Sequence, residues 1–215
     1  MTYLDLINAI LRRLRETVVT TASETDYSAL IGELINDAKK TVENSHEWTS
    51  QRSTISFPTV VGQSLYSLTG AKINSLVKRG MNDTTNQYLI QRNALYFEQE
   101  TILSTAASGS PTDFFIDGVD TNGALRVSVH PTPSAIETLK FVCVVPQEKL
   151  EADATTILVP DNPVIQLAYA MALRERGETG GQSAAEQFIV AQGALADAIA
   201  IDANRQPGEL DFFRA

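Results

Sequence analysis

The period of the hydrophobic pattern changes twice along this chain of 215 residues, and this order most constrains the fold. Near both ends, apolar residues recur at steps of three and four, which is typical of amphipathic helices. Between the ends, from Ser53 to Val145, the period is two, which is typical of strands in antiparallel sheets. An amphipathic helix must bury its apolar stripe, and the stripes at the two ends can bury each other. The pattern therefore predicts an α+β fold: a four-helix bundle from both chain ends with an inserted antiparallel β module, either a small sandwich or a rolled sheet.

The same changes of period give the predicted domain boundaries. Residues 1–49 and 160–204 form the helical bundle, residues 50–159 form the inserted β domain, and residues 205–215 form a C-terminal tail. Thr25 or Asp26 is the expected N-cap of the second helix, because either side chain can accept a backbone hydrogen bond. The two N-terminal stripes consist of Leu4, Ile7, Leu11, Leu14 and Val18, and of Leu30, Ile31, Leu34, Ile35, Ala38 and Val42.

Turn residues mark the strands of the β module. Asn122-Gly123 between two alternating runs is the strongest hairpin signal in the chain. Residues 87–98 are ambiguous between a strand and a short helix. We expect Trp48 to pack where the bundle meets the β module, with a hydrogen-bond partner for its indole N–H.

Capping residues mark the starts of the two predicted C-terminal helices. Residues 160–163 (PDNP) supply a cap and an N-terminal proline, and Gly177 ends that helix. Ser183 with Glu186 predicts a capping box for the next helix. That helix is rich in alanine, which permits another helix to approach closely.

The charge of the chain argues against tight binding of duplex DNA by a free-standing domain. Its formal net charge is −9 and its pI is about 4.7, whereas phosphate contacts are made by Lys and Arg. An acidic wall along which DNA slides is compatible with this balance. Arg12, Arg13 and Arg15 crowd the end of the first helix and are candidate partner-binding residues, although a solvated helix face is the simpler interpretation.

The residues that usually carry chemistry do not form a catalytic or metal-binding motif in the sequence. Cys143 is the single cysteine, which excludes an internal disulfide, and its β-branched neighbours predict a buried strand position. His46 and His130 lack partners at metal-ligand spacing. Asp113, Asp117 and Asp120 resemble half of a calcium loop, but Val129 stands where its glutamate would be. We therefore predict no catalytic residues, no metal and no cofactor, and we expect that the protein is not an enzyme.

The N-terminus lacks the basic start and apolar core of a secretory signal, and no uninterrupted apolar run reaches 18 residues. We therefore expect an intracellular product without a membrane span.

Several turn motifs in the β module resemble those of the head-to-tail connector (adaptor) proteins of tailed bacteriophages. Residues 61–68 (VGQSLYSL) resemble the family's G-Q-x-x-Y-x-L element, and residues 109–116 (GSPTDFFI) resemble its G-x-P-x-x-F element. Residues 130–133 (HPTP) are similar to its P-x-P, and residues 145–160 resemble its exit into the C-terminal helices. The match spans the chain in order. One departure is Thr69, where the family has proline after the tyrosine-containing strand.

This resemblance implies a structural virion protein, assembled in the host cytoplasm, that forms a ring beneath the portal protein. Such rings typically contain about twelve subunits. The bundle would contact the portal and neighbouring subunits, the β module would face tail or nozzle proteins, and genomic DNA would pass through the channel without sequence-specific binding.

The C-terminal tail carries further candidate partner-binding residues, Leu210, Phe212, Phe213 and Arg214. Two adjacent phenylalanines are unfavourable in water, so docking on the portal or on a neighbour is one interpretation and a solvated chain end is the other. The competing function is a binding module, in which a β domain on a helical stalk recognises glycan or protein through exposed Trp and Tyr. A small hydrolase, the third class, would need two carboxylates or a nucleophile in one pocket.

Overall fold

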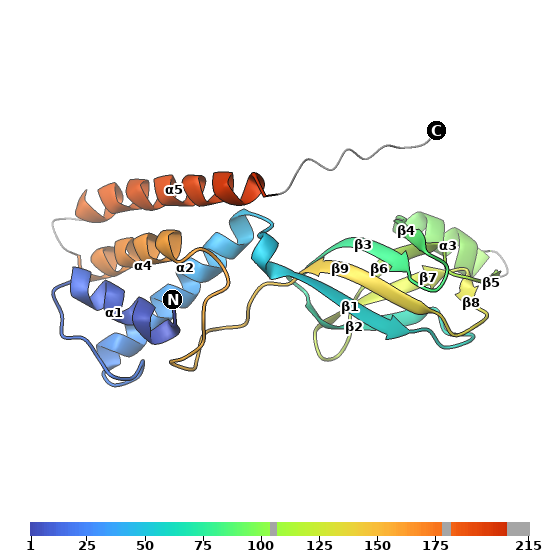
Figure 1. The fold of residues 1–215 in the computed structure, drawn as a ribbon, viewed down its shortest axis with the longest axis horizontal. Helices are drawn as coiled ribbons and strands as arrows, with labels where there is room; N and C mark the ends of the chain where they lie inside the picture. The colour runs from blue at the N-terminus through green and yellow to red at the C-terminus, as the bar shows by residue number, and fades with distance from the viewer. Residues whose placement is uncertain (104–106, 178–181, 206–215) are drawn as a thin grey trace. The chain divides into compact units, whose positions relative to one another are not determined.

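The computed structural model describes residues 1–103, 107–177 and 182–205, and the chain divides into two compact units. A helical unit combines Met1–Gln51 with the chain from Gln147 onward, and a β unit spans Arg52–Pro146 (Figure 1). The mixed α+β class predicted from the sequence is confirmed.

Four helices of the helical unit are formed by both ends of the chain. Thr2 caps the first and Thr25 the second, each in a reciprocal capping box, with Asp5 and with Ser28. The helix that follows Pro160 ends at Gly177, whose φ of +64° is a left-handed conformation that suits glycine. These helices are α1 (Tyr3–Arg13), α2 (Asp26–Ser45), α4 (Asp161–Arg176) and α5 (Gln182–Ala203).

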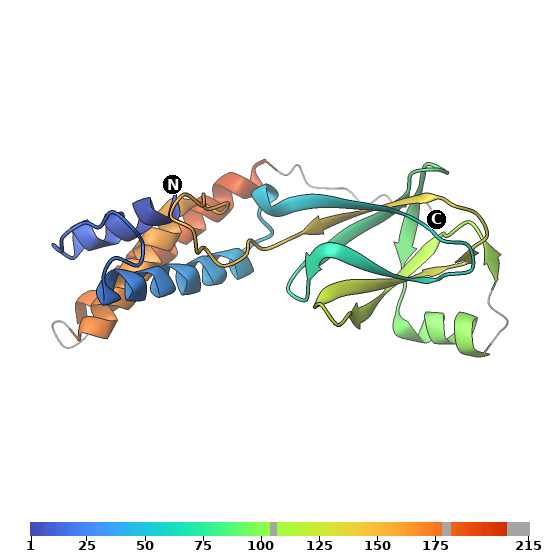
Figure 2. The ribbon, with the colours of Figure 1, turned by 90° about the horizontal axis from the view of Figure 1, so that it is seen from below.

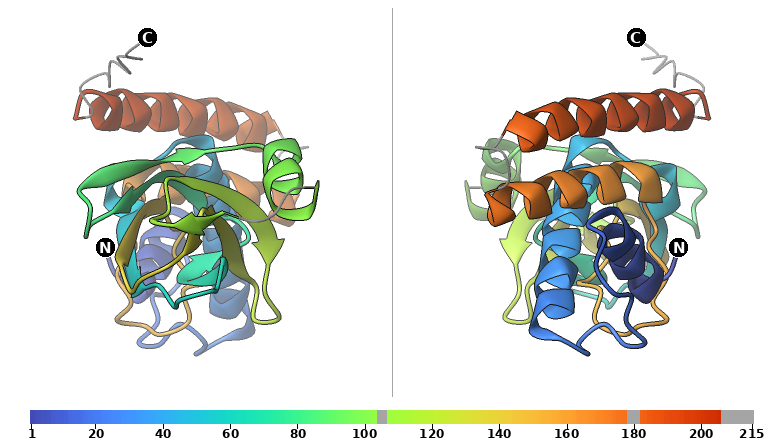
Figure 3. Two further views of the ribbon diagram at one scale, coloured as in Figure 1. Left: turned by 90° about the vertical axis from the view of Figure 1, so that its right-hand side faces the viewer. Right: turned by 90° about the vertical axis from the view of Figure 1, so that its left-hand side faces the viewer.

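All four helices contribute to one hydrophobic core. Leu6 and Ile10 of α1 and Ile31 and Ile35 of α2 are fully buried in it, and α5 lies alongside α4 (Figures 1 and 3). Trp48 belongs to this core as well. Its indole N–H donates to the Val42 carbonyl at 2.8 Å, which is the kind of partner expected.

Helix α1 ends before the last residue of the hydrophobic stripe that the sequence predicts for it. α1 stops at Arg13, and Val18 of the predicted stripe is 49% exposed, outside any helix. The predicted capping box at Ser183 concerns a side chain outside the described part of the chain.

The segment that leads out of the β unit packs with the helices. Leu150, Ile157 and Val159 are buried in the helical core, and the side chain of Asn36 bonds both backbone groups of Leu150, at 2.8 and 3.1 Å. The unit boundary therefore falls at Pro146/Gln147, earlier than the boundary at residue 159 that strand periodicity suggested.

A buried ion pair bonds the two segments at which the chain leaves and re-enters the helical unit, at Gln51 and at Gln147. The Lys39 ammonium lies 3.0 Å from each carboxylate oxygen of Glu43 and donates to the Gln147 carbonyl at 2.6 Å. Gln51 donates to Glu43 at 2.8 Å. Because every group in this cluster has a partner, its burial is tolerated.

The β unit is one curled sheet of seven strands in the order β1-β9-β3-β4-β6-β7-β2 (Figures 2 and 3). Phe57 of β1 and Tyr66 of β2 stack at 5.0 Å between ring centroids, so the two edge strands approach each other and the sheet is nearly closed. The strands are β1 (Arg52–Pro58), β2 (Leu65–Lys72), β3 (Leu76–Asn82), β4 (Gln87–Gln91), β6 (Asp113–Val119), β7 (Ala124–His130) and β9 (Thr138–Val144). Two short strands, β5 (Ser108–Gly109) and β8 (Thr132–Pro133), pair separately.

One pairing in the main sheet departs from the predicted antiparallel arrangement. β4 and β6 are parallel, because the chain between them includes α3 (Ala94–Glu98) and the π-helical turn Gln99–Leu103, which return it to the same direction. The ambiguous stretch 87–98 is thus a strand followed by a short helix. The predicted hairpin is present between β6 and β7, where Gly123 has a φ of +76°.

Candidate assembly surfaces

The turn motifs of the β module converge on one end of the β unit. The amide of Gly62 donates to the Pro133 carbonyl at 3.0 Å, and the amide of Ser134 donates to the Gly109 carbonyl at 3.1 Å. We call this region, residues 59–66, 108–110 and 131–137, the motif corner. Its glycines and prolines are therefore structural residues, which explains why they form a recognisable pattern.

Tyr66 anchors the first loop of the motif corner. Its hydroxyl accepts from the Val60 amide at 3.0 Å and donates to the Gln63 carbonyl at 2.6 Å. The ring is 7% exposed, so it cannot serve an exposed aromatic binding site.

Glu137 closes the motif corner from the other side. Its buried carboxylate accepts from the Ser110 hydroxyl at 2.8 Å and from the Asn82 amide, and its backbone N–H donates to Thr59 Oγ1 at 2.8 Å. A carboxylate with these partners holds the loops together and is not a free general base.

A second buried carboxylate lies beside aromatic rings. Asp113 accepts from Arg92 Nε at 2.5 Å and from Thr112 Oγ1 at 2.7 Å, and Arg92 stacks 4.8 Å from the centre of the Tyr96 ring. Asp113 raises the pKa of the Arg92 guanidinium through this bond, and desolvation raises the pKa of the Tyr96 hydroxyl. His130 lies at the edge of the Tyr96 ring. Because Arg92 and Thr112 hold its carboxylate, Asp113 itself is not a free general base.

The remaining chemical candidates are also structural. The Asp120 carboxylate accepts from the amides of Asn122 and Ala124, which places it in the hairpin turn. Cys143 is fully buried, and burial raises its pKa to about 11. No group of three potential metal ligands occurs within residues 1–103, 107–177 and 182–205.

Three arginines at the end of α1 and just after it lie on the surface of the helical unit. Arg12, Arg13 and Arg15 are exposed, and Arg15 adopts a left-handed φ of +59° just after the helix. Arg13 donates to the Gln166 side chain at 2.8 Å and lies over the Tyr169 ring. Arg176, from the end of α4, bonds the Leu14 carbonyl and the Glu16 carboxylate, so it joins this arginine patch. Hydrophobic periodicity could not predict this contact of Arg176, because it joins segments that are far apart in the sequence.

Helix α5 exposes an apolar face to water. Ala184, Ala191 and Ala198, spaced by seven residues, are buried, as is Asp202 near the end of the helix, whereas Ile189, Val190 and Ile201 are 70, 53 and 59% exposed. Gly193 adds to the open side, since a Cβ there would meet no atom within 4 Å. Isolated exposed aliphatic residues are ordinary, but several on one helix indicate a contact surface.

Length and composition alone would also let Ala184–Ala203 cross a membrane, which no uninterrupted apolar run had suggested. Asp202 of that segment accepts hydrogen bonds from the Thr49 backbone and hydroxyl, at 3.0 and 2.5 Å. A carboxylate tied into the helical unit favours a surface helix over a spanning one.

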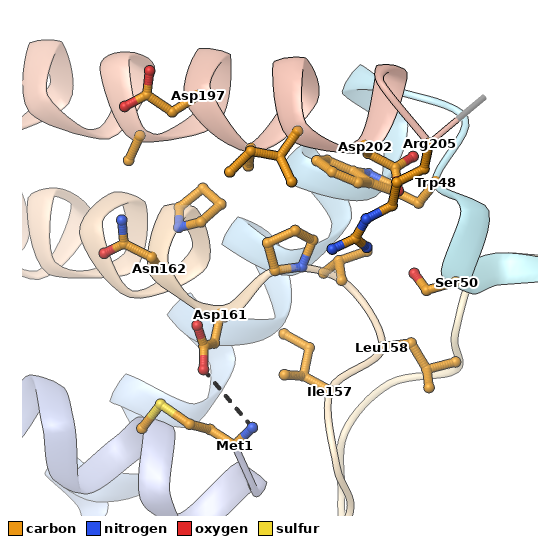
Figure 4. A pocket seen from close by; sticks show the side chains of 16 residues that line it. Met1, Trp48, Ser50, Ile157, Leu158, Asp161, Asn162, Asp197, Asp202 and Arg205 are labelled. Carbon is orange, nitrogen blue, oxygen red and sulfur yellow. Dashed lines mark ion pairs between the residues drawn. The ribbon is translucent and has the colours of Figure 1, made fainter. Parts of the chain in front are cut away.

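A pocket of about 500 Å³ lies within the helical unit, beside the C-terminal half of α5 (Figure 4). The lining is mixed: Trp48, Ile157, Leu158 and Ile201 are apolar, and polar or charged side chains complete it, namely Ser50, Asp161, Asn162, Asp197, Asp202 and Arg205. Asp161 on the rim lies 3.9 Å from the Met1 ammonium, the ion pair drawn in Figure 4. The candidate tail residues Leu210, Phe212, Phe213 and Arg214 lie outside the described residues.

Comparison with known proteins agrees with a structural role for this chain. No curated protein matches the chain. A sequence model described as the SU10 adaptor protein matches residues 1–210, nearly the whole chain. The resemblance to phage adaptors is thereby confirmed, and the family points to a structural virion component rather than an enzyme. The chain belongs to the SU10 adaptor protein family.

Proposed function

We propose that this protein assembles as a ring between the portal protein and the tail of a bacteriophage particle. The ring lines the channel through which the genome leaves, and it is assembled in the host cytoplasm. The observation that carries the proposal is the exposed apolar face of α5, which needs a protein partner, in a chain of the adaptor family.

The two sides of α5 support self-association of the helical unit. Ala184 and Ala198 pack on the unit's own core, while Ile189 and Val190 are exposed. In a cyclic ring each subunit meets two neighbours, so one apolar face can be buried repeatedly. The contact per neighbour is small, and the portal would serve as the template that orders the ring.

The arginine patch supports a second contact, with the portal. Arg12, Arg13 and Arg15 are exposed positive charges on a chain whose net charge is −9. Charges at the rim of an interface chiefly set orientation and association rate. The C-terminal residues Leu210, Phe212, Phe213 and Arg214 contribute once the subunit docks on the portal or on a neighbour, and the β unit faces tail or nozzle proteins.

The net acidic charge supports passage of DNA without binding. Like charges repel, so DNA inside such a ring would slide along the wall and would not be held by it.

Substitution on α5 tests the proposal. Ile189→Asp with Val190→Asp should strongly reduce the number of copies that the portal captures in a pull-down, because two charges would enter the apolar contact between neighbouring subunits. The control is Ile73→Asp, which changes a residue of the β unit that is 75% exposed. All variants should keep the helicity and melting temperature of the original chain. Undiminished capture of the α5 variant would contradict this role of the helix.

A further inference from the structure

We propose that the pocket beside α5 is the binding site of the protein's own C-terminal segment, residues 206–215, in the free subunit. This inference goes beyond ring assembly, because it concerns the subunit before it meets any partner. The occupant is the pair Phe212-Phe213, and Arg214 pairs with an acidic group at the rim.

The position of the chain end favours this occupant. Arg205, the last described residue, lines the pocket, and in Figure 4 its side chain extends from the end of α5 among the lining residues. The segment therefore starts at the rim of the site. Ten residues can span up to about 33 Å, which is more than enough to turn back. Pro207-Gly208 suits such a reversal, because proline and then glycine favour the central positions of a type II turn.

The chemistry of the lining matches the sequence of the segment. The pocket volume of about 500 Å³ is in the ordinary range for ligand sites and can accept bulky rings. Ile201 and Leu158 stay 59 and 46% exposed on its wall, so they gain from apolar cover. Asp161 and Asp197 bring carboxylates to the lining, which are complementary to Arg214.

Connectivity favours the protein's own segment over that of another copy. A short flexible connection gives the segment an effective concentration in the millimolar range at the pocket. If the segment binds with a dissociation constant of about 0.1 mM, it should slow alkylation of a thiol in the pocket about tenfold. The free subunit would thereby keep two phenylalanines out of water. A portal or neighbour that binds the same phenylalanines would have to compete with the pocket.

Alkylation of an engineered thiol in the full-length chain tests the proposal. Ile201→Cys and, separately, Leu158→Cys report from the pocket lining, and Ile189→Cys is the control on α5 outside it. Cys143 does not interfere, because it is fully buried and its pKa is raised to about 11. Deletion of residues 206–215, or Phe212→Ser with Phe213→Ser, should accelerate alkylation of both pocket thiols about tenfold and leave Ile189→Cys unchanged.

A synthetic peptide of residues 206–215 should restore protection to the truncated chain, which also shows that the pocket is still folded. Protection in the full-length chain should not change with protein concentration. Protection that rises with concentration would assign the pocket to the tail of a second copy, and equal rates with and without the tail would show that the tail does not bind there. Either result overturns the proposal, and neither involves the portal, so ring assembly is tested separately.

Discussion

Single residues of the motif corner show what a short sequence pattern records. Gly62, Tyr66 and Pro133 take part in hydrogen bonds that close the end of the sheet. Their pattern is therefore a requirement of the fold. Sequence reasoning could find these residues because turns restrict residue types locally.

Tyr66→Phe tests the motif corner. Loss of the hydroxyl removes the bonds to Val60 and Gln63 and should lower the free energy of unfolding by about 1–3 kcal/mol in urea titration. Tyr88→Phe is the matched control, because that ring is 65% exposed, and its effect should stay within about 0.5 kcal/mol. Equal effects of the two changes would contradict the anchoring role.

The hydrogen bonds of Asp120 in the hairpin turn predict that the stability of the folded chain depends on pH. The amide of Ala124, first among its partners, lowers the pKa of this carboxyl below its ordinary value of 3.8. The ionised form therefore stabilises the folded chain above about pH 4, and this contribution is lost as the pH falls through the folded-state pKa. Asp120→Asn should be less stable than the original chain at pH 7, and the difference should shrink at pH 3. A difference that does not vary with pH would contradict this role.

At the scale of elements, helix stripes and the Asn122-Gly123 hairpin could be predicted, because their signals lie within one turn or a few strand residues. The parallel pairing of β4 with β6 could not, since it depends on where α3 returns the chain. The packing of residues 147–159 with the helices could not be predicted either, because Leu150 and Ile157 look the same whether they face a sheet or a helix bundle.

The same limit applies to the candidate surfaces. The arginines of α1 could be named from the sequence, but the approach of Arg176 and the pocket beside Trp48 depend on contacts between distant segments. The many alanines of α5 indicated close packing, and in the structure Ala191 is buried whereas Ile189 is 70% exposed.

Two members of the predicted first stripe give a matched pair of substitutions. Leu11 is 2% exposed in the helical core, so Leu11→Asp should cost several kcal/mol and lower the melting temperature measured by circular dichroism. Val18 is 49% exposed beyond the end of α1, and Val18→Asp should leave melting nearly unchanged. Equal loss in both variants would contradict the position at which the helix ends.

At the scale of the whole molecule, the central claim is self-association on a portal template. The subunit exposes an apolar helix face and a positive patch on a chain of net charge −9. Each surface alone supports a weak contact, whereas a closed ring engages all copies at once and multiplies the contacts. Stable rings should therefore require the portal, and the protein alone should associate weakly.

Native mass spectrometry of the protein mixed with its portal tests self-association on the portal. We expect one assembly that carries many adaptor copies on each portal oligomer, about twelve if the ring follows a twelvefold portal. The protein alone should give mainly single subunits at the same concentration. A complex that holds a single copy of this chain per portal oligomer would contradict the account.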